Sequence, residues 1–181
     1  MKLREYVYGD MEFYYNQSRK ERLIFWLIDD PIFYIAKYLR YLRKEEYFSA
    51  KSNIVGTILG LYYFRKKNRL GNRLGFKIPR NCFGPRLTIY HHGEIIVNEK
   101  ARIGADCKLH GGNCIGNNGI TDKTPRVGNG LDLGIGAKII GNVVLENNIK
   151  IGANAVVTKS FNEDNITLVG IPAKKLNNRE V

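Results

Sequence analysis

Residues 136–161 read GAKIIGNVVLENNIKIGANAVVTKSF, and their bulky apolar residues Ile139, Leu145, Ile151 and Val157 stand six positions apart. An amphipathic helix would repeat such residues about every 3.6 positions, and a simple strand would repeat them every two. A period of six instead fits short strands that are joined by tight turns and stack rung upon rung around a continuous core. The stretch therefore predicts a parallel β-helix built from hexapeptide repeats.

The same frame extends through most of the second half of the chain. Glycine and asparagine become frequent from about residue 75, and both residues suit corners that require a positive φ. Thr121 is the only break in the frame. Cys107 lies four residues after an anchor, where small or apolar residues recur, so we interpret it as a packing residue. The other anchors of the frame are Val97, Ile103, Leu109, Ile115, Val127 and Leu133.

Residues 1–74 follow a helical pattern. Apolar residues recur there at spacings of three and four, and Pro31 is placed to open a helix that runs to about Phe48. The apolar stripe of that helix would consist of Ile32, Ile35, Leu39 and Leu42. We expect three parts: a helical N-terminal region at 1–74, a β-helix domain at 75–176, and a tail at 177–181.

The composition is that of a folded protein in a reducing compartment. Hydrophobic residues make up 44% of the 181 residues, which is enough for a core. The three cysteines show no C-x-x-C spacing and no signal peptide is visible, so we expect reduced thiols and a cytoplasmic location. The longest uncharged apolar run, residues 54–64, is shorter than the about 20 residues that span a bilayer.

The net charge of +12 indicates an acidic partner. Nucleic acid is not expected, because no recognisable nucleic-acid-binding module accompanies the charge. The basic helix at 31–48 could lie on a membrane surface, although such a stripe more often packs against its own protein. The basic N-terminal half as a whole could hold the protein at the anionic inner membrane face. Seven of the basic residues fall between positions 65 and 80: Arg65, Lys66, Lys67, Arg69, Arg73, Lys77 and Arg80.

The quoted stretch, followed by VGIPAKKL at 169–176, resembles the hexapeptide-repeat acyltransferases. The likeness is greatest to the serine acetyltransferase branch, and within it to the enzymes associated with capsule and exopolysaccharide synthesis. The resemblance implies a left-handed coil of three hexads per turn and a homotrimer. It also implies that acetyl-CoA lies as co-substrate in the groove between neighbouring helices.

The resemblance assigns the binding site of the acetyl donor. IGANAVVTK at 151–159 matches the motif in which Ala153, Thr158 and Lys159 would line the path of the pantetheine and phosphates. GIPAKK at 170–175 matches a Gly-x-Pro-Ala-basic signature that would place Lys174 and Lys175 near the nucleotide phosphates. Small residues let a slender chain approach the backbone, and lysine ammonium groups pair with phosphate.

The acceptor site departs from the pattern of serine acetyltransferases. Those enzymes place an aspartate immediately before the histidine equivalent to His91, where this chain has Tyr90. They also carry a His-Pro pair after an extended loop, where this chain has Thr124 before Pro125. Capsule-type relatives often show a His-x-Gly element at His91 to Gly93. The departures favour a sugar or polysaccharide precursor over serine as the acceptor.

Acyl transfer to an alcohol needs a general base, and a neutral imidazole is the usual one near pH 7. His91, His92 and His110 are the candidates. Correspondence with the family favours His91, which the frame places at an anchor position, one hexad before Val97. One expected coil of three hexads separates His92 from His110, so these two should stack on neighbouring rungs. We rank His91 first, His110 second and His92 third.

Left-handed β-helices also occur among carbonic anhydrases, which bind zinc through three histidines. Adjacent strand residues point to opposite faces, so His91 and His92 are poor ligands of one ion, and we expect no metal. The sequence therefore predicts a trimeric, acetyl-CoA-dependent O-acetyltransferase that acts on a sugar or polysaccharide precursor. The alternatives are a serine O-acetyltransferase and a non-catalytic β-helix binding module.

Overall fold

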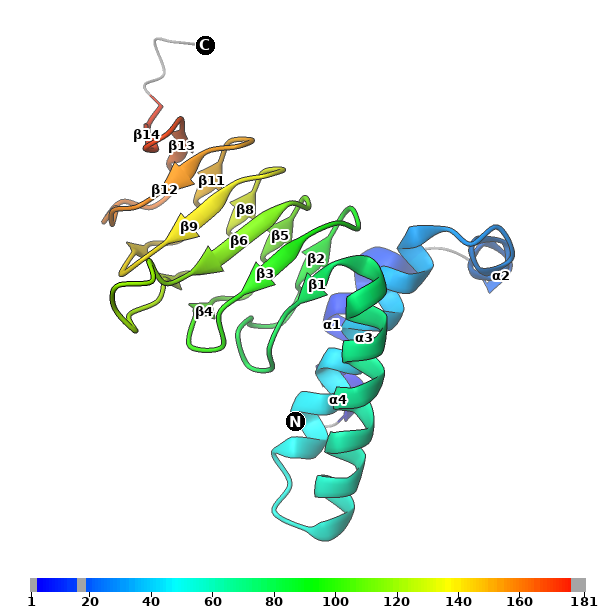
Figure 1. Cartoon of the computed structure of the whole chain (residues 1–181). Coiled ribbons are helices and arrows are strands. Elements are labelled where there is room, and N and C mark those ends of the chain that lie inside the picture. The colour runs from blue at the N-terminus through cyan, green and yellow to red at the C-terminus, as the bar shows by residue number, and fades with distance from the viewer. Residues whose placement is uncertain (1–2, 16–18, 177–181) are drawn as a thin grey trace.

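The computed structural model describes residues 3–15 and 19–176, and Figure 1 shows the helices followed by a stack of short strands. The helices are α1 Leu3–Tyr15, α2 Arg19–Leu27, α3 Pro31–Ser49 and α4 Ile54–Leu74. Asp30 caps α3 by accepting a hydrogen bond from the backbone N–H of Ile32, and Gly75 ends α4 with a φ of 80°. The expected tail at 177–181 lies outside the described residues.

The strands form three sheets whose members are far apart in sequence. Sheet A contains β1 Phe76–Lys77, β3 Ile95–Val97, β6 Asn113–Gly116, β9 Lys138–Ile140 and β12 Val156–Val157. Sheet B contains β4 Arg102–Ile103, β7 Arg126–Val127 and β10 Val144–Leu145. Sheet C contains β2 Thr88–Ile89, β5 Lys108–Leu109, β8 Asp132–Leu133, β11 Lys150–Ile151, β13 Thr167–Val169 and β14 Lys174–Lys175. In Figure 1, sheet A faces the viewer and most of sheet C lies behind it.

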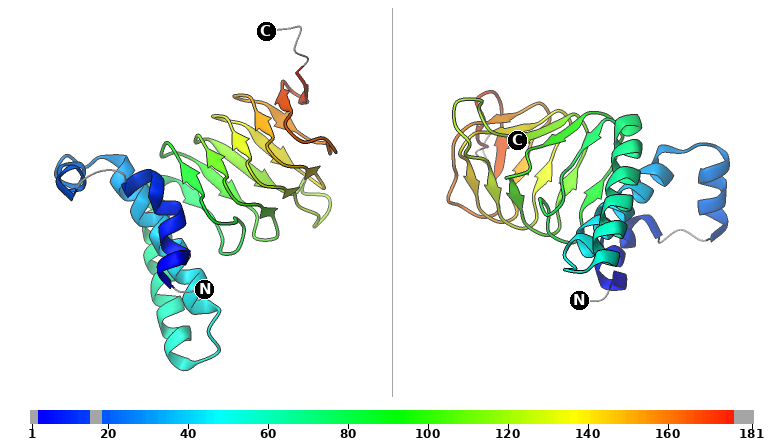
Figure 2. Two further views of the ribbon diagram at one scale, coloured as in Figure 1. Left: turned by 180° about the vertical axis from the view of Figure 1, so that it is seen from behind. Right: turned by 60° about the horizontal axis from the view of Figure 1, so that its bottom comes forward.

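All strand pairs are parallel except β13 with β14. From β3 to β12, successive strands enter sheets A, B and C in turn, so the chain winds as a coil and each strand pairs with the equivalent strand one coil later. The expected parallel β-sheet architecture and the N-terminal helical region are therefore confirmed. Figure 2 shows the coil from two further sides, with the helices gathered at its N-terminal end.

The register shows that the coils differ in length. Lys150 pairs with Asp132 and Val156 with Lys138, and both pairs are three hexads apart. Ile139 pairs with Ile115 across four hexads, because the loop at 117–125 adds one hexad without changing the frame. The spacing from Ile89 to Leu109 exceeds three hexads, because the turn at 90–94 is two positions longer than the frame allows.

The anchors of the six-residue frame fill the interior of the coil. Leu109, Leu133 and Ile139 are fully buried, and all ten anchors are at most 7% exposed. Cys107 is 1% exposed, which confirms that it packs into this core. Each Å² of apolar surface removed from water contributes about 25 cal/mol to the free energy of folding. This stack of aliphatic side chains is therefore the main stabilising feature of the domain.

A buried ion cluster fixes the helices to the first coil. The guanidinium of Arg43 on α3 binds Asp10 of α1 at 2.6 Å and Glu46 at 2.9 Å, and it donates to the carbonyl oxygen of Phe83 at 3.0 Å. Asp10 in turn accepts from the backbone N–H of Leu87 at 3.0 Å. All three charged side chains are at most 4% exposed, so each depends on its partners for compensation of its charge.

Two tyrosine hydroxyls cover the open edge of the first coil. Tyr14 donates to the carbonyl oxygen of Ile89 at 2.7 Å and accepts from its N–H at 2.8 Å. Tyr38 accepts from the N–H of Ile78 at 3.3 Å. Burial raises the pKa of both phenols, so they remain neutral donors. The hydroxyls take the place of a preceding strand, and the helices thereby protect an edge that could otherwise pair with another chain.

The apolar stripe of the helix at 31–48 is not available to a membrane. Ile35, Leu39 and Leu42 are at most 1% exposed, and Ile32 is half-buried against the same core. The stripe packs between α1, α4 and the first coil, which confirms the more common of the two outcomes expected for this helix, packing against its own protein. None of the helices in the described ranges is long and apolar enough to cross a bilayer.

Candidate active site

The three candidate histidines lie along one edge of the coil. We call this edge the C–A corner: it consists of the turns that leave sheet C and enter sheet A, at residues 90–94, 110–112, 134–137 and 152–155. His91 and His92 belong to the first of these turns and His110 opens the second. Successive turns of the corner are about 4.8 Å apart, so their side chains stand one above the other.

His110 is held by a carboxylate and an aromatic ring. Its Nε2 lies 2.9 Å from Asp132 Oδ1, and its ring stacks on Tyr90 with centroids 4.6 Å apart and planes 26° from parallel. Both His110 and Asp132 are about one-third exposed. An imidazole oriented by a carboxylate is the arrangement that general bases use. Asp132 was not predicted from the sequence, although it precedes an anchor and therefore had to point outward.

The predicted stack of His92 on His110 is wrong. Ile89 pairs with Leu109, so the residue that stacks against His110 from the preceding rung is Tyr90. The two extra positions in the turn at 90–94 shift His92 out of that register. For the same reason His91 does not occupy an anchor position: its side chain is exposed, and Ile89 is the buried residue of that rung.

His91 and His92 are both exposed at the start of the C–A corner. Their backbones run beside Gly111, where an added Cβ would lie 3.6 Å from His91 Cβ. Neither imidazole forms a hydrogen bond with another residue in the described part of the chain. Both rings are therefore open to a substrate or to a neighbouring chain.

Asn113 fixes the shape of the corner from inside. It is 1% exposed, accepts from the N–H of Gly111 at 3.0 Å, and donates to the carbonyl oxygens of Gly134 at 2.8 Å and Ala137 at 3.3 Å. A buried amide that is bonded on both sides holds two successive turns in register. The turn that carries His110 is thus tied to the turn above it. No pattern in the sequence indicates this role.

The candidate donor residues do not converge within one chain. Ala153 is exposed on the C–A corner, two rungs above His110. Thr158 and Lys159 are exposed after β12, at the edge where the chain leaves sheet A for sheet B. Sheet A separates the two positions. The Lys159 ammonium lies 5.8 Å from the centre of the Phe161 ring.

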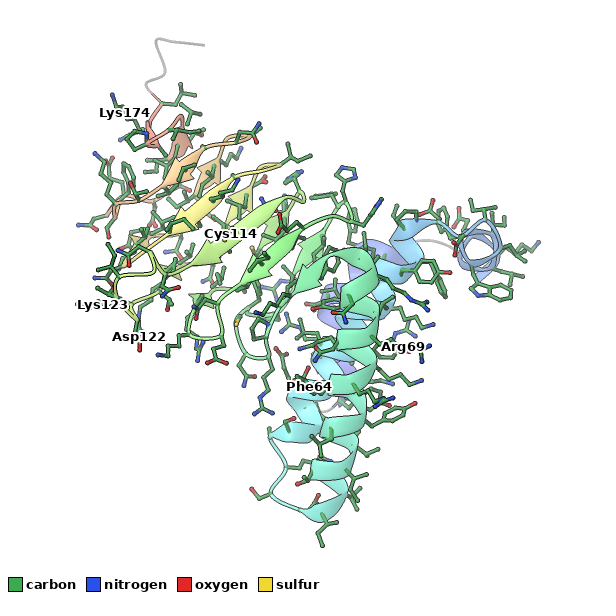
Figure 3. All side chains as sticks on the ribbon, in the orientation of Figure 1. Phe64, Arg69, Cys114, Asp122, Lys123 and Lys174 are labelled. Carbon is green, nitrogen blue, oxygen red and sulfur yellow. The ribbon has the colours of Figure 1, made fainter. Side chains whose placement is uncertain are left out.

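Lys174 and Lys175 form β14 at the C-terminal end of sheet C, and Figure 3 shows Lys174 there. Lys175 forms an ion pair with Glu163. Val169 pairs with Lys174, so the outward column that starts at Tyr90 and His110 continues to Lys174. Its members from one end to the other are Tyr90, His110, Gly134, Gly152, Val169 and Lys174.

The two glycines of this column leave the backbone bare between His110 and Val169. A Cβ at position 134 would lie 2.7 Å from the carbonyl oxygen of Ile151, and one at position 152 would lie 3.0 Å from Val169 Cγ1. Rung packing therefore requires glycine at position 134 and disfavours a larger residue at 152. Two successive rungs, about 4.8 Å apart, therefore carry no side chain at this position of the column.

A separate cavity lies away from the C–A corner. A cavity of about 660 Å³ lies between α4 and the first coil, where Phe64, Arg80 and Lys100 contribute to its lining, and none of the candidate site residues lines it. Among residues 3–15 and 19–176, no three His, Cys, Asp or Glu side chains come close enough to share a metal ion.

Comparison with curated proteins shows that the chain is similar to acetyltransferases. The chain is 33% identical over 129 residues to a protein of Escherichia coli K12 that is provisionally named colanic acid biosynthesis acetyltransferase WcaB, covering 61% of this chain and 79% of the relative. It is 35% identical over 96 residues to the serine acetyltransferase of Staphylococcus epidermidis, covering 52% of this chain and 45% of the relative. The chain thus spans less than half of that serine acetyltransferase. No protein-family model matches the chain.

Among solved structures, the chain is similar to a serine acetyltransferase in complex with CoA. The TM-score is 0.65 at 25% identity, covering 79% of this chain and 57% of that one.

Proposed function

The chain belongs to the hexapeptide-repeat acyltransferase family, and on that premise we propose that it is a CoA-dependent O-acetyltransferase acting on a hydroxyl of a sugar or polysaccharide precursor. One observation carries the choice of acceptor: the likeness to the E. coli protein named for colanic acid biosynthesis covers 79% of that relative, against 45% of the serine acetyltransferase. Tyr90, at the position where serine enzymes carry aspartate, supports the same choice.

The proposed assembly is a homotrimer of left-handed coils. The handedness and the trimer both follow from the resemblance to the family. A trimer would also bring the edge that bears Thr158 and Lys159 of one chain toward a neighbouring chain. This arrangement would gather the donor residues that sheet A separates within a single chain.

The bare column of the C–A corner fits the donor. Gly134 and Gly152 present no side chain beyond their backbones, so a slender pantetheine arm could lie against them. The ammonium groups of Lys174 and Lys175 would pair with the phosphates, and Ala153 would border the path. Acetyl-CoA supplies the thioester whose acyl carbon is attacked.

In the proposed reaction, His91 acts as the general base. Its imidazole takes the proton from the acceptor hydroxyl as that oxygen bonds to the acyl carbon of the thioester. The carbon–sulfur bond then breaks, and the proton returns from His91 to the departing sulfur, so that ester and CoA thiol are the products. His91 is favoured by its correspondence with the family histidine and by its exposed ring.

A specific observation favours a second candidate for the base. His110 already has the carboxylate partner that a base needs, and its Nδ1 remains available on the side away from Asp132. In the leading proposal, His110 and Tyr90 instead form one wall of the acceptor site. The two assignments predict different effects of removing Asp132.

Steady-state kinetics of three variants separates the two candidates. With His91 as the base, His91→Asn should lower kcat by about 10²- to 10⁴-fold, and Asp132→Asn should mainly raise KM for the acceptor. If His110→Asn and Asp132→Asn both abolish turnover while His91→Asn loses less than tenfold, the base is His110. The acidic limb of the pH dependence of kcat should disappear only in the variant that lacks the base.

The acceptor class is tested with purified protein, acetyl-CoA and detection of the released CoA thiol. Thiol release with free serine at the rate of a dedicated serine enzyme would contradict the polysaccharide proposal. Release with a hexose-containing oligosaccharide, and slow release with serine, is the expected result. A non-catalytic binding module would show neither release nor a rise in melting temperature with CoA.

A further inference from the structure

The outer face of α4 has one apolar half and one basic half. Residues at positions 54, 58, 61, 65, 69 and 72 share one side of the helix, and this side is exposed from end to end. The first three turns present Ile54, Val55, Ile58, Leu61 and Tyr62, whose exposed fractions range from 49% to 79%. The following turns present Arg65, Lys66, Arg69 and Arg73, all exposed. We call these nine residues the α4 outer face.

The position of this face makes it accessible. Figure 1 shows that the connection between α3 and α4 forms a tip that projects well away from the coil. Figure 3 labels Phe64 and Arg69 on opposite sides of α4, with Arg69 on the side away from the strands. The apolar half thus lies at the tip of the hairpin formed by α3 and α4, and the basic half lies farther along α4, toward the coil.

The charge of the hairpin is almost entirely of one sign. Residues 31–74 contain ten Lys or Arg residues and only two acidic residues, Glu45 and Glu46. Both carboxylates are buried, Glu45 in an ion pair with Lys67 at 2.8 Å and Glu46 in the pair with Arg43. The exposed surface of the hairpin therefore has no carboxylate of its own that could pair with the basic half of α4.

We propose that the α4 outer face docks the protein on an anionic membrane surface. The apolar turns at the tip would enter the boundary between headgroups and acyl chains, and Arg65 and Arg69 would contact the acidic headgroups. A second copy of this chain fits less well, because the same face of that copy would offer no carboxylate to the basic half. Nucleic acid would leave the apolar half exposed to water.

This inference goes beyond the proposed acyl transfer and does not depend on it. Membrane docking is tested with the full-length protein and no acetyl-CoA, by flotation with vesicles of phosphatidylcholine that contain about 30% phosphatidylglycerol. The expected result is binding to these vesicles, at least about tenfold weaker binding to pure phosphatidylcholine, and release between about 0.1 and 0.5 M salt. Equal binding to both vesicle types, or binding to neither, would overturn the proposal.

Two double variants localise the contact. Ile58→Ser with Leu61→Ser removes apolar area, and Arg65→Gln with Arg69→Gln removes two charges; each should weaken binding by about tenfold or more. The first variant tests insertion, and the second should also reduce the salt dependence. Since all four side chains are exposed, the circular dichroism melting curve should not change.

Matched controls lie on the coil. Ile120 is 86% exposed in the loop at 117–125, and Lys123 is exposed in the same loop. Ile120→Ser with Lys123→Gln should leave vesicle binding unchanged. If the α4 variants instead change the oligomer mass in analytical ultracentrifugation and leave vesicle binding intact, the face is a contact between copies and the membrane proposal is wrong. Acetyl transfer to a water-soluble acceptor should be the same in the α4 variants and in the wild type.

Discussion

The three cysteines differ in environment although all are free. Cys82 and Cys107 are each 1% exposed, whereas Cys114 is partly exposed on the outer side of sheet A, where it pairs in register with Lys138. Burial raises the pKa of the Cys82 thiol to about 11, and burial likewise raises the pKa of the Cys107 and Cys114 thiols. Because the thiolate is the reactive form, all three thiols should react slowly at neutral pH.

Alkylation by iodoacetamide should therefore label a single cysteine in the native protein. A raised pKa leaves less thiolate at a given pH, so the labelling rate of Cys114 should rise about tenfold per pH unit from pH 7 to 9. Mass spectrometry of tryptic peptides should find the label on Cys114, with Cys82 and Cys107 reacting only in urea. A Cys114→Ser variant is the control and should take up no label while folded. Native labelling of Cys107 at a comparable rate would contradict its placement in the core.

For single residues, the six-residue frame was sufficient to predict which way a side chain points. It was not sufficient to predict which side chains on different strands come into contact. Cys107 was predicted to face inward because its spacing from the anchors fixes its side. Asp132 also had a fixed side, but its contact with His110 depends on a register of four hexads between β5 and β8. That register depends on the length of the loop at 117–125, and no local pattern fixes which strands such a loop brings together.

Among the elements, α1 and the first coil meet at Tyr14. Its hydroxyl is the hydrogen-bond partner of both the N–H and the C=O of Ile89. Tyr14→Phe would leave two buried backbone groups without this partner, so it should lower the free energy of unfolding by about 1–3 kcal/mol. Urea denaturation measures the difference. Tyr62→Phe, at an exposed position on α4, should change the stability by less than about 0.5 kcal/mol.

The ion cluster around Arg43 joins α1, α3 and the first coil. Arg43→Met should destabilise the protein by about 3–5 kcal/mol, because Asp10 and Glu46 would stay buried without their cation. The matched control is Lys100→Met, which breaks the exposed Lys100–Asp122 pair and should cost at most about 1 kcal/mol. Thermal unfolding of the two variants compares them directly. Equal losses would show that the buried cluster contributes no more than a surface pair.

Helices and strands could be predicted because apolar residues recur in each with a different spacing. The surfaces against which these elements pack could not be predicted. The stripe at Ile35, Leu39 and Leu42 has the spacing of a surface helix on a membrane and equally that of a helix packed on its own protein. Its surroundings decide the outcome, and α1 together with the first coil covers it. Conversely, the apolar run at 54–64 was predicted only to be too short to span a bilayer, and the 79% exposure of Ile54 does not follow from its sequence.

For the whole molecule, the distribution of the candidate residues bears on how a site is completed. His91 and Ala153 lie on the C–A corner, whereas Thr158 and Lys159 lie at the next edge, across sheet A. A single side chain cannot bridge the width of that sheet. If both edges serve one donor molecule, the two sets come from neighbouring chains of the proposed trimer. Each chain then contributes to two different sites.

Mixed trimers test this arrangement. His91→Asn and Lys159→Glu should each lower activity when present in every chain, the first by loss of the base and the second by repulsion of the donor phosphates. When the two variants are co-expressed with different tags and assemble at random, about one interface in four combines an intact His91 with an intact Lys159 from its neighbour. The mixed sample should therefore regain about a quarter of the wild-type activity per site.

A mixture of the two separately assembled variants should regain none. If the co-expressed sample also stays inactive while its mass is that of a trimer, His91 and Lys159 must act within the same chain, and the shared site is wrong.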